Sequence, residues 1–169
     1  NSGVRAAKRL YRQIGGGNSG VEAEIAFLTF SAPLDKNTRQ GGIWLPNVNY
    51  SIGVMSDHFF MQHCGELAAL AAQRQESPVG AVVVLGGYII GEGIEAGKSK
   101  QDVTCHAEVE AIRAATQARG KNLSAATLYT THEPCILCSY VIRHHRIARV
   151  VIGQAVTHIG GATSAYPVL

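Results

Sequence analysis

The chain has 169 residues, of which 46% are hydrophobic and 16% are charged, and its formal net charge is +3. This length suits one domain, or one domain with an appendage, and the composition is globular, which excludes a disordered chain. The longest apolar run, residues 79–90, is too short to cross a bilayer, and four cysteines are too few for a disulfide scaffold.

Charge and composition change near Met55. Residues 1–54 contain six basic and three acidic residues and no histidine or cysteine, whereas residues 55–169 contain nine basic and nine acidic residues, all seven histidines and all four cysteines. We expect residues 1–54 to be an unassigned segment that is not native to the domain, either translated from a wrong start or left from a fusion. A genuine, loosely structured extension is the alternative. Residues 55–169 are expected to form the functional domain.

The elements predicted after residue 55 alternate between helices and strands. Helical spacing of apolar residues, β-branched apolar runs, a Gly-Gly turn and capping residues identify them. They are, in chain order, a helix over 58–74, a hairpin over 79–91 that turns at Gly86-Gly87, a polar loop over 92–104, a helix over 106–118 capped by Thr104, a strand over 126–131, a helix opened by Pro134 and ending near residue 145, and a strand over 148–152.

This order predicts an α/β fold of three layers, α/β/α, with a mixed central sheet. Ligands of such sheets bind beyond the carboxyl ends of strands, beside the N-termini of helices. Two motifs occupy such positions: Cys105-His106-Ala107-Glu108 at the start of one helix and Glu133-Pro134-Cys135-Ile136-Leu137-Cys138 at the start of the next.

The residue types in these motifs are metal ligands. Cys135 and Cys138 lie three residues apart, so a helical first turn brings their sulfurs to one side, and His106 can add a nitrogen from the neighbouring helix. Three protein ligands leave a fourth tetrahedral position open, which is the pattern of catalytic zinc sites. Glu108 can reach the same metal only if the ion lies beyond the helix end, near its axis.

Two alternatives remain open from the residues themselves. A Cys-x-x-Cys at a helix start is also the redox motif of thioredoxin-like proteins, and a closed structural zinc site would need a fourth ligand, for which Cys105 is the nearest candidate. Cys64 lies on the apolar side of its predicted helix and is expected in the core.

The pattern His106-x-Glu108 with Pro134-Cys135-x-x-Cys138 resembles the zinc-dependent deaminases of the cytidine/deoxycytidylate deaminase superfamily. The resemblance covers residues 58–169, and it is strongest to the bacterial nucleoside and nucleobase deaminases and tRNA adenosine deaminases. It implies a cytidine deaminase-like fold with Zn²⁺ held by His106, Cys135 and Cys138. It also implies that zinc activates a water for attack on the amine-bearing ring carbon, while Glu108 moves the protons and ammonia leaves.

The resemblance also identifies a candidate substrate site at Glu95 and Ala107. Related chains have an asparagine at the position of Glu95, and an ionised carboxylate only accepts hydrogen bonds, so Glu95 favours a substrate that offers N–H or hydroxyl groups. The alternative is that Glu95 is a solvated loop residue. Because related chains continue beyond the fourth strand, we also expect this chain to be truncated at its C-terminus.

These observations predict a hydrolytic deaminase of a nucleobase, nucleoside or related amino-heterocycle. The neutral 55–169 region does not favour the alternative of a tRNA adenosine deaminase, although a basic patch exists. A catalytically inactive zinc-binding homologue is the alternative of another class. Thiolate ligands predict the cytoplasm, and the resemblance implies a homodimer and no membrane partner. The patch comprises Arg143, His144, His145, Arg146 and Arg149.

Overall fold

A computed structural model of the chain describes residues 9–10, 24–27, 56–165 and 167–169. Its helices are α1 (Asp57–Gln73), α2 (Gly97–Lys100), α3 (Ala107–Arg119) and α4 (Ile136–His144), and its strands are β1 (Arg9–Leu10), β2 (Glu24–Phe27), β3 (Gly80–Leu85), β4 (Tyr88–Ile94), β5 (Thr127–His132) and β6 (Arg149–Gln154). In this part of the chain, no helix has the length and apolar character that a bilayer crossing requires.

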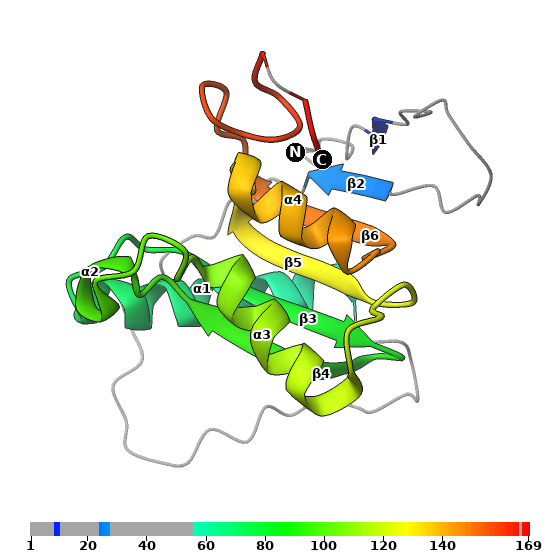
Figure 1. The fold of residues 1–169 in the computed structure, drawn as a ribbon, viewed down its shortest axis with the longest axis horizontal. Coiled ribbons are helices and arrows are strands. Elements are labelled where there is room, and N and C mark those ends of the chain that lie inside the picture. The colour runs from blue at the N-terminus through cyan, green and yellow to red at the C-terminus, as the bar shows by residue number, and fades with distance from the viewer. Residues whose placement is uncertain (1–8, 11–23, 28–55, 166) are drawn as a thin grey trace, which may run out of the picture.

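The strands form one mixed sheet in the order β1-β2-β6-β5-β3-β4. β3 runs antiparallel to both β4 and β5, whereas β5, β6 and β2 run parallel to one another. β4 and β5 therefore point the same way, and their carboxyl ends lie at one edge of the sheet. Figure 1 shows α3 and α4 on one face of this sheet and α1 on the other. The predicted three-layer α/β/α fold and mixed sheet are confirmed.

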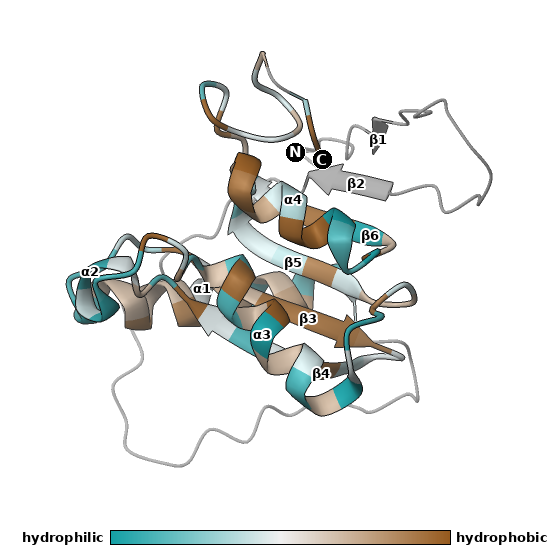
Figure 2. Cartoon of the chain, in the orientation of Figure 1, coloured by the Kyte–Doolittle hydropathy of each residue, from teal (hydrophilic) through white to brown (hydrophobic). Residues whose placement is uncertain are grey.

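A separate apolar core fills each side of the sheet. The core under α3 and α4 includes Ile112, Leu128 and Ile142, and the core under α1 includes Phe60 and Cys64. β3 contributes side chains to both cores, which is why it is almost uniformly hydrophobic in Figure 2. Strand residues that are buried on both faces need apolar side chains at every position, not only at alternate positions. The expected core position of Cys64 is confirmed, since its side chain is fully buried.

The hairpin turns where it was predicted, because Gly86 and Gly87 both adopt positive φ angles, 59° and 85°. β4 is longer than predicted, and its later residues lie directly beneath α3. A Cβ atom added at Gly93 would lie 2.1 Å from the carbonyl oxygen of Ala107, which begins α3. This close approach of helix to strand sets the position of the α3 N-terminus.

Three local predictions differ from the structure. The loop over 92–104 contains the short helix α2. The N-cap of α3 is His106, not Thr104, because Thr104 Oγ1 donates instead to Asp102 Oδ1 at 2.7 Å. The N-cap of α4 is Cys135, so Pro134 precedes the helix rather than opening it. β1 and β2 add two strands from residues 1–54, where no element was predicted, while the division of the chain at residue 55 stays a prediction.

An ion pair joins α1 to the sheet. Arg149 donates two hydrogen bonds to the carboxylate of Asp57, at 2.7 and 2.6 Å, and Tyr129 Oη donates a third at 2.8 Å. The bonds from Arg149 are the main reason why the pKa of Asp57 lies below its ordinary value of 3.8. A paired bidentate geometry of this kind orders both side chains.

We expect Asp57→Asn to lower the melting temperature at neutral pH, and the difference from the unchanged protein to disappear in acid. A carboxyl whose pKa is depressed by folding stabilises the native state above its unfolded pKa and loses that contribution as pH falls through the folded pKa. Thermal melts of both proteins between pH 7 and pH values below 3.8 measure the difference. A difference that persists unchanged in acid would show that the charge of Asp57 is not the source.

Candidate metal centre

Both predicted motifs lie at the same edge of the sheet. α4 follows the carboxyl end of β5, and α3 begins after the carboxyl end of β4 and the short α2 segment. His106 and Cys135 are the N-cap residues of α3 and α4, and Cys138 lies in the first turn of α4. Residues separated by about thirty positions in the sequence thus meet between two helix N-termini.

The three predicted ligands form a compact triangle of donor atoms. His106 Nδ1 lies 3.5 Å from Cys135 Sγ and 3.3 Å from Cys138 Sγ, and the two sulfurs are 3.7 Å apart. A tetrahedral zinc ion with Zn–S bonds of about 2.3 Å and a Zn–N bond of about 2.1 Å requires separations of about 3.8 Å between sulfurs and about 3.6 Å between nitrogen and sulfur. His106, Cys135 and Cys138 therefore fit one zinc ion, and among the residues that the structure describes no fourth ligand joins them.

Glu108 lies beside this triangle, although its spacing from His106 would separate the two residues on the side of a helix. His106 is the N-cap of α3 and Glu108 lies in its first turn, and both side chains approach Cys138 Sγ. Glu108 Oε2 lies 3.5 Å from Cys138 Sγ, and Oε1 accepts a hydrogen bond of 3.4 Å from Thr130 Oγ1. Glu108 is 4% exposed, and this burial raises the pKa of its carboxyl group to about 7.

The surroundings shift the pKa values of the two cysteines in opposite directions. The hydrogen bond between Cys135 Sγ and Cys138 Sγ, with backbone N–H groups at the start of α4, lowers the pKa of Cys135 to about 5. The same bond and burial raise the pKa of Cys138. A thiolate at a helix N-terminus is the ligand form that a metal ion needs.

Comparison with known families decides the identity of this centre. Residues 55–154 match the model of the cytidine and deoxycytidylate deaminase zinc-binding region. The chain belongs to this deaminase family. The family match and the geometry of His106, Cys135 and Cys138 together establish zinc as the cofactor.

Relatives within the deaminase family differ in the substrates that their names give. The chain is 38% identical over 112 residues to a tRNA-specific adenosine deaminase of Streptococcus pyogenes serotype M18, covering 66% of this chain and 70% of the relative. It resembles the solved structure of a tRNA:A34 deaminase that acts at the wobble position of transfer RNA (37% identity, TM-score 0.63, 65% of this chain and 85% of that chain). It also resembles guanine deaminase from Bacillus subtilis (35% identity, TM-score 0.58, 60% and 66%). The aligned part is thus about two thirds of the length of two of these three relatives.

Cys105 is not part of the ligand group in this deaminase. Its side chain is buried, and its sulfur lies 3.5 Å from Arg113 Nη1. The metal-binding group found among the described residues contains His106, Cys135 and Cys138 and not Cys105, so the closed four-ligand site is not supported. The redox alternative is not supported either, because the histidine contacts both sulfurs of the Cys-x-x-Cys motif.

The two predicted substrate residues have different surroundings. Ala107 is fully buried at the first position of α3, next to the ligand His106. Glu95 is half-buried and its Oε1 accepts a hydrogen bond of 3.3 Å from the backbone N–H of Gly97, just before α2. That bond gives Glu95 a local role in the loop, and its role in substrate binding stays a prediction.

Two polar residues beside the zinc site, Thr130 and Glu133, are not singled out by the sequence pattern. Thr130 is fully buried and its hydroxyl lies within hydrogen-bonding distance of Glu108 and of the His132 carbonyl oxygen. Glu133 is 4% exposed although it carries a carboxylate. In the sequence, both are polar residues close to the Cys135-x-x-Cys138 motif. Only the fold shows that their side chains are buried beside the zinc site.

Proposed function

We propose that this deaminase hydrolyses an amino group from the ring of a nucleobase, a nucleoside or a related amino-heterocycle. The observation that supports this most strongly is the Glu108 carboxylate beside a zinc site with three protein ligands. When bound, zinc lowers the pKa of a coordinated water, so that the water can attack the amine-bearing carbon at neutral pH.

The residues of this chain then have distinct tasks. Glu108, which is not a ligand, takes one proton from the attacking water and passes it to a ring nitrogen. It then takes the proton of the hydroxyl group that has been added to the ring carbon and passes it to the amine, which leaves as ammonia. One carboxylate serves both transfers because they occur in sequence. Thr130 holds Oε1 of that carboxylate, which leaves Oε2 facing the metal ligands. The surrounding burial excludes bulk water from the proton transfers.

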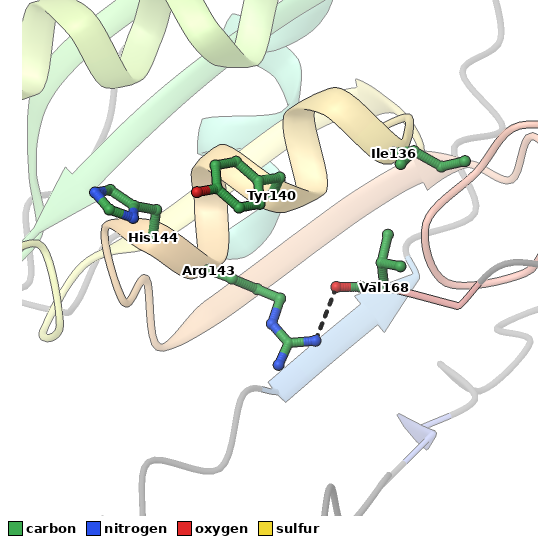
Figure 3. A pocket seen from close by; sticks show the side chains of 5 residues that line it. All are labelled: Ile136, Tyr140, Arg143, His144 and Val168. Carbon is green, nitrogen blue, oxygen red and sulfur yellow. Dashed lines mark hydrogen bonds between the residues drawn. The ribbon is translucent and has the colours of Figure 1, made fainter.

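A second candidate, tRNA adenosine deamination, is favoured by the relatives that carry this name. RNA binding needs positive charge near the site. Arg143, His144 and Arg146 are exposed, and Figure 3 shows Arg143, Tyr140 and His144 along α4. Tyr140 and His144 stack with ring centroids 5.9 Å apart, and stacked rings of this kind can receive an unpaired base.

Two observations reduce the positive charge that the predicted basic patch could offer to RNA. Arg149 is paired with Asp57, and Arg143 Nη1 donates to the carbonyl oxygen of Val168 at 3.1 Å (Figure 3). The pocket on this side of α4, lined by Ile136, Tyr140, Arg143, His144 and Val168, contains none of the three metal ligands. Because the charge of residues 55–169 is also balanced, we keep the small-molecule substrate as the first proposal.

An ammonia-release panel tests both candidates. The zinc-loaded protein is incubated with free bases, with nucleosides and with unmodified transfer RNA, and ammonia and inosine are measured. Release from a base or nucleoside supports the first proposal, and inosine formed only in transfer RNA supports the second. A zinc-containing protein that releases no ammonia from any of them would contradict both and identify an inactive homologue. The homodimer and the cytoplasmic location stay predictions.

A further inference from the structure

Glu133 is a buried carboxylate with an unusual set of donors. It accepts hydrogen bonds from the backbone N–H groups of Val156 (2.8 Å), Ala162 (2.8 Å) and Thr163 (2.6 Å) and from Thr163 Oγ1 (2.5 Å). All of these donors belong to the segment that follows β6. Hydrogen bonds to an ionised acceptor are roughly twice as strong as neutral ones, and without this acceptor four part-buried donor groups lose their partner. One side chain thus fixes residues 156–163.

The same segment lies against the backbone of a zinc ligand. Gly160 pairs with Cys135 in an antiparallel bridge, and the Gly161 N–H donates to the carbonyl oxygen of Pro134 at 2.8 Å. Gly160 also packs directly against the Glu133 side chain, since a Cβ atom at Gly160 would lie 2.2 Å from the carboxyl carbon of Glu133. The Ser139 hydroxyl donates to the Cys135 carbonyl oxygen at 2.8 Å from the helix side.

We propose that Glu133 is a positioning residue of the zinc site: its carboxylate holds residues 156–163 over Pro134 and Cys135, and this cover keeps the Cys135 sulfur at ligand distance from His106 and Cys138. Cys135 is the ligand that needs such support. It is the N-cap of α4, so no residue of the helix precedes it, and it is more exposed than Cys138. Residues around metal ligands set the metal affinity by orienting the ligands.

The test measures zinc release from Glu133→Gln. The glutamine amide has the same size as the carboxyl group but only one acceptor oxygen. Its NH₂ group would face the N–H and hydroxyl donors of residues 156–163, so this segment would lose part of its hydrogen bonds to residue 133. We expect zinc to transfer to an excess of a chelating dye about 10- to 100-fold faster than from the unchanged protein. We also expect the Co²⁺-substituted variant to show altered cobalt–thiolate absorption. Neither readout depends on the substrate, so the result is independent of the function proposed above.

Asp57→Asn is the matched control, because it makes the same chemical change in a carboxylate that joins α1 to β5 and β6 through Tyr129 and Arg149. It should lower the melting temperature yet release zinc within about twofold of the unchanged rate, as expected for a change without contact to the ligands.

Thr163→Val keeps the proposal testable if Glu133→Gln does not fold. It removes a single hydroxyl donor to Glu133, and we expect roughly fivefold faster zinc release. Folded variants of Glu133 or Thr163 that release zinc at the unchanged rate, with an unaltered cobalt spectrum, would overturn the proposal. Equal acceleration in Asp57→Asn would do the same, because it would show that general destabilisation is sufficient.

Discussion

Glu108→Gln is expected to lower kcat by about 10²- to 10⁴-fold on whichever substrate the ammonia-release panel identifies. Glutamine has nearly the same size as glutamate, but its amide cannot accept a proton from water and return it to the substrate. The carboxylate lies 3.5 Å from Cys138 Sγ and is almost fully buried, which places it beside the metal ligands and away from bulk water. Steady-state kinetics with the ammonia assay measure the change.

Glu110→Gln is the matched control for that experiment. Glu110 lies two residues further along α3 and forms ion pairs with Lys100 and Arg113 near the surface. Its substitution should leave kcat close to the original value. Zinc content, measured by metal analysis, should be unchanged in both variants because neither residue is a ligand. Intact turnover in Glu108→Gln would show that the proton transfers use another group.

Cys138→Ser is expected to abolish stable zinc binding. Cys138 is fully buried and its sulfur completes the ligand triangle with His106 and Cys135. The serine oxygen is smaller and keeps its proton at neutral pH, so the remaining histidine and single thiolate cannot hold the ion tightly. Metal analysis after dialysis should find the purified variant nearly free of zinc, and ammonia release should be lost with it.

Cys105→Ser distinguishes a zinc site with three protein ligands from a closed site in which Cys105 is the fourth ligand. Cys105 is the residue next to His106 and is also buried, so the two serine variants make the same chemical change at two buried cysteines. We expect Cys105→Ser to retain zinc fully. Loss of zinc from this variant would mean that Cys105 moves in as a fourth ligand, which would contradict an open coordination position.

The sequence predicted those features that depend on local patterns. The hairpin over β3 and β4 follows from two β-branched runs and a Gly-Gly turn, and α1 follows from apolar residues at helical spacing. The zinc ligands were predicted because their residue types and spacing are restrictive. The convergence of Glu108 with His106 was also foreseen, since both lie where side chains can extend past a helix end.

Other features depend on contacts that spacing does not encode. Thr104 is a good capping residue by type, yet its hydroxyl donates to Asp102 and accepts from Arg113, and His106 is the N-cap instead. β2 consists of four residues and is recognisable only through its parallel pairing with β6. Glu133 looks like a solvated residue in a polar turn until the segment after β6 folds back onto it.

The position of the zinc ligands also has a consequence for the unfolded chain. The ion links the N-cap of α3 to the start of α4, and the chain segment that it closes between the two helices runs from His106 to Cys135, 29 positions along. A cross-link that closes a loop of that length removes conformational entropy from the unfolded state worth about 3 to 4 kcal/mol, by the estimate used for disulfides. Zinc therefore stabilises the folded domain as a cross-link, in addition to its part in the reaction. Its removal should lower the free energy of unfolding even when no substrate is present.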